Sequence, residues 1–138
     1  MDTTIAASVL TWAQGHAALS GLPVGHEELP AEGVNAAMVS SLSGDPFVKR
    51  FKSGGYIAAY PFQVILRVNG ADTAARLAAM STLSDIAASI ETTSTWPVAP
   101  AGYDYMAFEL RTLPAPIAAD DSGVRDYQIT FELTYRKG

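Results

Sequence analysis

The side chains best suited to catalysis or metal binding lie in one polar segment, residues 25–33, which reads GHEELPAEG. It combines His26 with Glu28 and Glu32, which are residue types used for general acid–base work and for metal coordination. The spacing does not match HExxH, and no second histidine lies nearby on one helix face. We therefore expect no metal site. A small hydrolase that uses His26 with Glu28 or Glu32 is an alternative that the sequence disfavours.

Neither histidine is accompanied by a nucleophile motif. No GxSxG elbow occurs near His16 or His26. Adjacent carboxylates occur in solvated turns, as at Asp120 and Asp121. His16 itself completes the apolar stripe of a predicted helix, which indicates a packed histidine. The sequence thus favours a protein with no enzyme activity.

The composition predicts one domain spanning residues 1–138. With 49% hydrophobic and 17% charged residues, the chain can bury a core but is too short for two comfortable domains. It has no cysteine, so stability must come from packing. No apolar run approaches the roughly 20 residues that a membrane helix needs, and no signal peptide is recognisable. We expect a soluble intracellular protein with no membrane partner.

Charge is unevenly distributed along the chain. Residues 1–45 hold five acidic residues and no Lys or Arg, and the first cations arrive together as Lys49, Arg50 and Lys52. An acidic chain with a net charge of −5 is not expected to bind nucleic acid specifically, because that requires many clustered cations. One short basic spot remains as a candidate binding feature.

The element that organises the chain is the segment 125–137, RDYQITFELTYRK. Polar and apolar side chains alternate along it without interruption. Period-two alternation predicts a strand with one buried and one wet face, as in an antiparallel sheet. Thr130 and Thr134 fall on the polar face, so they are candidates for contact with water or a partner. The apolar face comprises Tyr127, Ile129, Phe131, Leu133 and Tyr135.

The remaining patterns complete an α+β fold: a single mainly antiparallel, or mixed, sheet flanked by two helices, in the order α-β-β-β-α-β-β. Asp72 is expected to cap the second helix, and Pro61 to bend its strand or place it at an edge. Pro114 and Pro116 are expected to end the next strand. The expected elements are helices from about Thr3 to Ser20 and over 73–90, and strands over 34–42, 47–52, 56–69, 103–113 and 125–137.

The patterns also predict which side chains face the core. In the segment 34–42 the even-numbered residues form the apolar side, and in 103–113 the apolar side holds Met106, Phe108 and Leu110. The second helix presents an arc that includes Leu77 and Leu83. Trp96 lies in a loop of small residues and proline, either as a buried anchor or as a partner contact.

Three stretches in a set order resemble the minor capsid, or tail terminator, proteins of long-tailed bacteriophages. They are GGYIAAYPFQVILRVNGADTAARLAAMSTLSDIAASIE, YDYMAFELRTL and DDSGVRDYQITFELTYR, and they cover most of residues 33–136. The likeness lies in a Gly-rich turn before a PFQVILR-type strand, a helix of about 20 residues, and a closing Y-x-I-x-F-x-L-x-Y strand.

This resemblance implies a virion protein that is made in the host cytoplasm and has no enzyme activity or cofactor. It implies a homo-oligomeric ring, often six-fold, on the end of the tail tube, in contact with the tail-tube protein and the head-completion protein. Passage of DNA through the ring is left open. In such a ring we expect Lys49, Arg50 and Lys52 to form a mobile basic arm that binds a neighbouring subunit's acidic surface or the tail protein.

A function of another class also fits the patterns. The sheet and helices could enclose an apolar pocket lined by Tyr56, Tyr60, Phe62 and Tyr105, as in a small-molecule-binding or regulatory domain.

Overall fold

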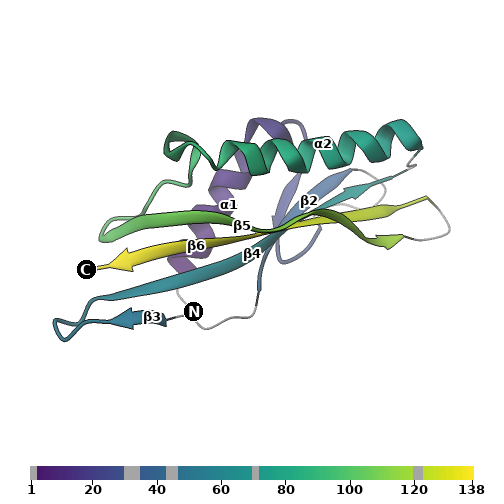
Figure 1. Ribbon diagram of the computed structural model, residues 1–138. Coiled ribbons are helices and arrows are strands. Elements are labelled where there is room, and N and C mark those ends of the chain that lie inside the picture. Colours follow the sequence, from purple (N-terminus) through teal and green to yellow (C-terminus); the bar gives the residue numbers. More distant parts are fainter. Residues whose placement is uncertain (1–2, 30–34, 43–46, 70–71, 120–122) are drawn as a thin grey trace.

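The computed structural model describes residues 3–29, 35–42, 47–69, 72–119 and 123–138, and it contains two α-helices and a six-stranded sheet (Figure 1). The elements are α1 (Thr3–Gln14), the 3-10 turn η1 (Ala17–Leu19), β1 (Val24–His26), β2 (Ala36–Ser41), β3 (Phe47–Arg50), β4 (Tyr56–Val68), α2 (Thr73–Ser89), the 3-10 turn η2 (Thr93–Thr95), β5 (Tyr103–Ala119) and β6 (Arg125–Lys137).

The sheet has the order β1-β2-β4-β6-β5, and β3 pairs with β4 beside the end of β2. All pairs are antiparallel except β1 with β2. The predicted α+β class with a mainly antiparallel sheet is confirmed. One strand was missed: the polar segment from Gly25 begins inside β1, and directly after β1 the Glu27 N–H donates to the Val39 carbonyl at 2.9 Å.

β4 and β6 form the centre of the sheet, and β6 matches the predicted alternation. They pair in unbroken register from Tyr56 opposite Lys137 to Val68 opposite Arg125. All five apolar positions of β6 are buried, and Phe131 is fully buried. The Phe131 ring lies 5.4 Å from the rings of both Phe62 and Phe108. These aromatic contacts bring three strands together at one point.

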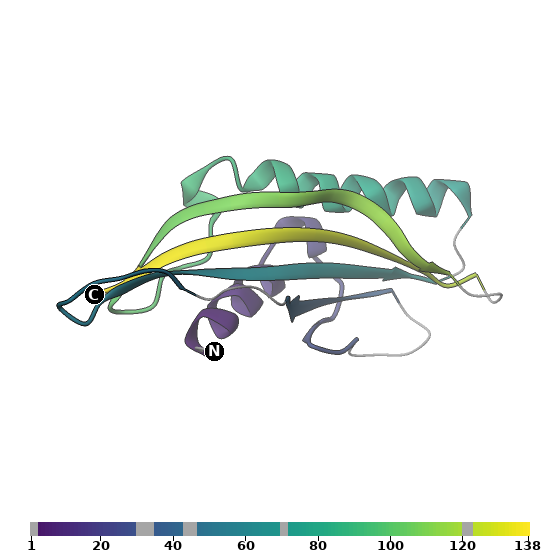
Figure 2. The same cartoon turned by 60° about the horizontal axis from the view of Figure 1, so that its bottom comes forward.

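Both helices contribute their buried side chains to the same core. Ile5 and Val9 from α1 and Leu83 and Ile86 from α2 join the apolar face of β4 and β6 in one cluster. In Figure 2 the long strands β5 and β6 are bowed, and α2 runs along them. The opposite face of the sheet carries the polar row of β6 and is covered by none of the described helices.

The helices differ from prediction in the end of α1 and in the exposure of Leu77 on α2. α1 ends at Gln14, before Gly15, and the chain continues through η1, which His16 caps by accepting the Ala18 N–H. In α2 the Asp72 side chain accepts the Ala75 N–H at 2.8 Å, so the predicted cap is confirmed. Leu77, predicted to face the core, is 66% exposed.

β2 presents the face opposite to the predicted one. Ala37 and Val39 join the core, whereas Met38 lies on the other side of the sheet. The small side chains of β2 made its apolar alternation ambiguous, because Ala36 and Ser40 are also buried. Pairing with β4 therefore decided the face. Residues 44–46, whose sequence Gly-Asp-Pro predicts a turn, lie outside the described residues.

β5 is longer and less regular than predicted. Its register with β6 shifts between Tyr105 and Ala107, so Phe108 faces the core together with Tyr105 while Met106 is exposed. Such a bulge breaks the period-two pattern. Pro114 and Pro116 do not end the strand, because β5 is the last strand of the sheet order and proline is tolerated at an edge.

β4 is an interior strand, yet Pro61 still sits at a local edge. Its carbonyl accepts the Leu42 N–H at 2.9 Å, just beyond the end of β2. Since a residue's N–H and C=O point to the same side of a strand, the missing N–H falls where the ladder with β2 has ended.

Within the described residues, none of the helices is long and apolar enough to cross a bilayer.

We predict that Phe131→Ala lowers the free energy of unfolding by about 3 to 5 kcal/mol, because it removes a buried ring and leaves a cavity. Leu113→Ala is the control, since Leu113 is exposed on β5 and surface changes usually cost under about 0.5 kcal/mol. Urea denaturation measures both variants. Equal losses would show that the aromatic cluster is not the centre of stability.

Candidate functional site

The basic cluster predicted from Lys49, Arg50 and Lys52 lies on the hairpin that joins β3 to β4. All three side chains are exposed, and Lys49 Nζ lies 5.4 Å from the centre of the Phe51 ring. The hairpin closes through the Phe51 N–H, which donates to the Gly55 carbonyl at 2.8 Å. The segment is therefore a paired strand and turn, as the strand expected over 47–52 indicates.

The fold adds two cations that sequence reasoning missed. Arg136 and Lys137 end β6, opposite Ile57 and Tyr56 at the base of the hairpin. The Arg136 guanidinium stacks over the Phe51 ring at 5.1 Å. Five of the nine Lys and Arg residues thus gather at one end of a chain with net charge −5. The pairing of β4 with β6 creates this cluster, and spacing along the chain could not reveal it.

The glycine pair after the basic residues is required by this geometry. Gly54 has a φ of +99°, which disfavours any residue with a Cβ. A Cβ on Gly55 would lie 2.8 Å from the Lys137 carbonyl oxygen, so the close approach of the hairpin to the end of β6 needs glycine. The hairpin is thereby fixed against the C-terminal strand.

Trp96 anchors the loop after α2 and also borders a groove. Its Nε1 donates to the Ile90 carbonyl at 2.6 Å, and its ring lies 6.0 Å from the Phe108 ring. The half-buried ring faces Trp12 across a mainly apolar groove of about 530 Å³ between α1 and residues 96–100. Trp12 Nε1 donates to the Thr95 carbonyl at 2.7 Å, so both indole N–H groups are satisfied within the chain.

Thr130 and Thr134 lie on the helix-free face of β6, as predicted, but differ in accessibility. Thr130 is 6% exposed, and its hydroxyl is 2.6 Å from that of Thr112 on β5. Thr134 is half-buried. Of the two, Thr134 is the more accessible to a partner.

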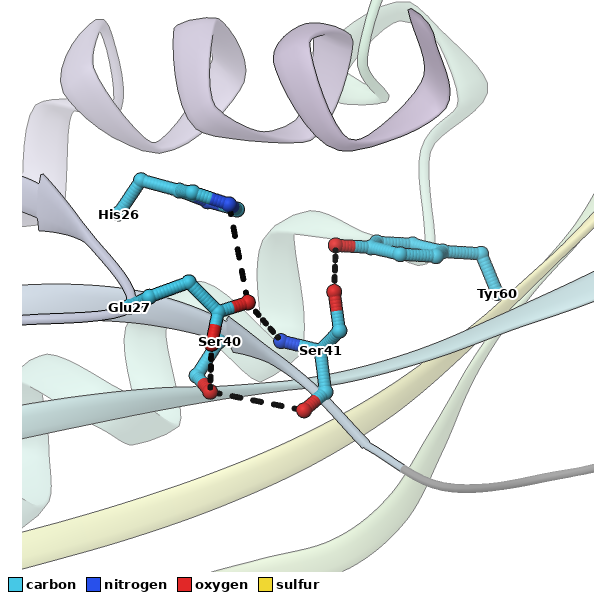
Figure 3. Close-up of polar contacts among 5 residues, drawn as sticks. All are labelled: His26, Glu27, Ser40, Ser41 and Tyr60. Atoms are coloured by element: carbon cyan, nitrogen blue, oxygen red, sulfur yellow. Dashed lines mark hydrogen bonds and ion pairs between the residues drawn. The ribbon is translucent and has the colours of Figure 1, made fainter. Parts of the chain in front are cut away.

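A polar network links the short strand β1 to the end of β2 and to β4 (Figure 3). Glu27 accepts the Ser41 N–H at 3.2 Å and the Ser40 hydroxyl at 3.3 Å, and the Ser41 hydroxyl is 2.8 Å from the Tyr60 hydroxyl. Burial raises the pKa of Tyr60, partly opposed by its bond to Ser41. Glu27 adopts a φ of 65°, unusual for a residue other than glycine.

This network does not form a catalytic triad. His26 Nε2 lies 3.6 Å from Glu27 Oε1, but both serines contact Glu27 and none of the described contacts joins them to His26. A serine nucleophile needs the imidazole beside its hydroxyl. Glu32, Asp120 and Asp121 lie outside the described residues. Within the described part of the chain, no group of three His, Asp or Glu is placed to hold a metal.

The aromatic residues proposed for a ligand pocket mostly fill the core instead. Tyr60 and Phe62 are buried and stack with ring centroids 5.6 Å apart. Tyr105 is half-buried, and its hydroxyl donates to Ser8 Oγ at 2.7 Å, while Tyr56 contacts Tyr135. These four side chains therefore do not enclose a common cavity.

The geometry thus defines a small α+β protein with a basic hairpin, a mainly apolar groove beside α1 and a polar network beside β1. No protein-family model matches the sequence, and no curated protein matches it. Among solved structures, a chain from the virion of a native gene transfer agent particle is similar with a TM-score of 0.61 and 19% identity, covering 96% of this chain and 93% of that one. A second solved structure is similar with a TM-score of 0.52 and 17% identity, covering 99% and 94%. At these identities the likeness concerns the fold.

The His16 side chain joins the end of α1 to the end of α2. Its titration makes the contribution of this packing measurable as a change of stability with pH. Its Nε2 lies 2.8 Å from Ser89 Oγ at the end of α2. Burial lowers the pKa of His16 below its ordinary value of about 6.5, opposed by attraction to Asp85. The unfolded chain therefore binds this proton more readily, so the folded state loses stability as the pH falls below about 6.5.

We predict that the wild type loses more free energy of unfolding than His16→Asn when the pH falls from about 7.5 to about 5.5. Asn keeps an acceptor for the Ala18 N–H but does not titrate. Urea denaturation at both pH values measures the difference. Identical losses in the two proteins would show that His16 does not carry this pH dependence.

Proposed function

We propose that this chain is a non-enzymatic structural protein of a phage-like virion, which closes as a ring on the end of the tail tube and joins it to the head-completion proteins. The observation that carries the proposal is the similarity to a chain of a gene transfer agent virion, which extends over nearly the full length of both chains. The tail-terminator resemblance of residues 54–91, 103–113 and 120–136 supports the finer assignment.

The distribution of charge and structure supports a ring. A closed ring needs two different surfaces that meet head to tail. The basic end of the sheet, with Lys49, Arg50 and Lys52, lies on the edge formed by β3, and β5 forms the other edge. Two distinct surfaces on opposite edges are the arrangement that such assembly requires.

A second candidate function is a small-molecule-binding domain, which is favoured by the groove between Trp12 and Trp96. Its volume of about 530 Å³ suits a small apolar ligand. It would use residues other than the tyrosines expected from the sequence. Native mass measurement distinguishes the two: a closed oligomer supports the structural role, and a monomer that retains a small molecule supports binding.

We predict that reversing the hairpin charges with Lys49→Glu, Arg50→Glu and Lys52→Glu abolishes capping of tail tubes without unfolding the protein. The three side chains are exposed, and surface substitutions each change stability by under about 0.5 kcal/mol. Electron microscopy of purified tubes mixed with the protein measures capping, and thermal melting measures folding.

Arg76→Glu, an exposed charge reversal on α2, is the control and should leave capping intact. Capping by the triple variant at the wild-type level would exclude the hairpin as a contact. Folded wild-type protein that never caps tubes and never oligomerises would argue against the tail role itself.

A further inference from the structure

A second groove lies on the edge of the sheet opposite the basic hairpin. It has a volume of about 600 Å³ and runs between the C-terminal end of α2 and β5. β5 ends the sheet order, and none of the described strands pairs with its outer side. A terminal strand presents backbone groups with which another chain can pair. The groove is lined by Ala87, Ala88, Ile90, Glu91, Phe108, Glu109 and Leu110.

The groove combines apolar surface with two carboxylates. Leu110 is 36% exposed on the face of β5 that packs against α2, and Glu91 is exposed at the end of α2. Glu109 is exposed at the rim of the groove, on the helix-free face of β5. Within the described residues neither glutamate forms an ion pair. Glu109 also lies directly opposite Glu132 on β6, and like charges in that position repel each other.

That repulsion is only partly relieved inside the chain. The cation near Glu132 is Arg111, whose Nε lies 3.9 Å from the Glu132 carboxylate. A further cation placed at Glu109 would neutralise the remaining charge. The groove therefore favours an occupant that carries an apolar side chain next to positive charge.

The chain itself supplies such a segment on its other edge. Val48 lies where the register of β3 with β4 shifts, and it is 65% exposed. Lys49 and Arg50 follow it directly and are exposed. β3 and β5 lie on opposite edges of one sheet, so this segment cannot enter the groove of its own copy.

We propose that residues 48–52 of one copy dock into the α2–β5 groove of the next copy. Val48 covers the apolar surface around Leu110, while Lys49 and Arg50 approach Glu91 and Glu109. The contact joins two different surfaces, so it repeats from copy to copy and closes when the rotation between copies permits. This inference rests on the proposed ring and names the contact that forms it.

Cysteine cross-linking tests the contact directly, because the chain has no native cysteine. Wild-type-length protein carrying Val48→Cys and Leu110→Cys is oxidised and separated under non-reducing conditions. The expected result is a ladder of reducible oligomers that ends at the ring, while each single-cysteine variant stops at a dimer.

The matched control pairs Val48→Cys with Val98→Cys, since Val98 is exposed but lies outside this groove. A ladder from the Val48 and Leu110 pair that is no more abundant than the control ladder would overturn the proposal. Both double variants should unfold at the same urea concentration as the wild type, which excludes cross-linking through unfolded protein.

A charge exchange tests the ion pairs independently. Lys49→Glu with Arg50→Glu, or Glu91→Lys with Glu109→Lys, should each weaken self-association by roughly two- to fivefold per ion pair lost. Mixing the two variants should restore association, because opposite charges then meet at the interface between them. Sedimentation of each variant and of the mixture measures this. Loss without recovery in the mixture would contradict the assignment.

The inference and the proposed function fail in different ways. If wild-type protein caps tail tubes but the Val48 and Leu110 cysteines do not join copies, the function stands and this contact is wrong. If the cysteines join copies into closed oligomers that never cap tubes, the contact stands and the tail role is wrong.

Discussion

The structure depends on the pairing of β4 with β6, which runs in register along the full length of both strands. This pairing aligns Phe62 beside Phe131 and directs the apolar face of both strands to one side. Because neighbouring side chains of a strand point to opposite faces, a shift of one residue would turn the whole core outward. The two helices then have one surface on which to bury their own apolar side chains.

Packing both helices on one face leaves the edges and the other face of the sheet uncovered by the described helices. The same pairing carries Arg136 and Lys137 to the hairpin that holds Lys49 and Arg50. Positive charge thus accumulates at one end of an acidic protein. On the other edge, Glu91 at the end of α2 lies beside apolar surface of β5, and Glu109 lies at the rim of the same groove. The surfaces that we propose for assembly therefore follow from the topology of the sheet.

The edge strand β5 is the most irregular strand in its pairing. Its bulge turns Met106 outward while Tyr105 and Phe108 stay on the core side. Its prolines are tolerated because an edge residue need not donate to a ladder on its outer side. Bulges and prolines also discourage uncontrolled strand pairing along an exposed edge. A selective contact near Leu110 is compatible with these features.

The sequence alone determined the elements whose patterns are long and strongly amphipathic. The bounds of β6, its buried face and the Asp72 cap could be predicted, because alternation of large apolar residues and a capping carboxylate act locally. Tertiary structure decided the face of β2, whose small side chains fit either side, and the exposure of Leu77. It also formed β1, joined five cations from two distant segments, and opened the groove beside Glu91 and Glu109. Each of these features depends on contacts between residues far apart in the chain. The energy of such contacts cannot be read from a local sequence pattern.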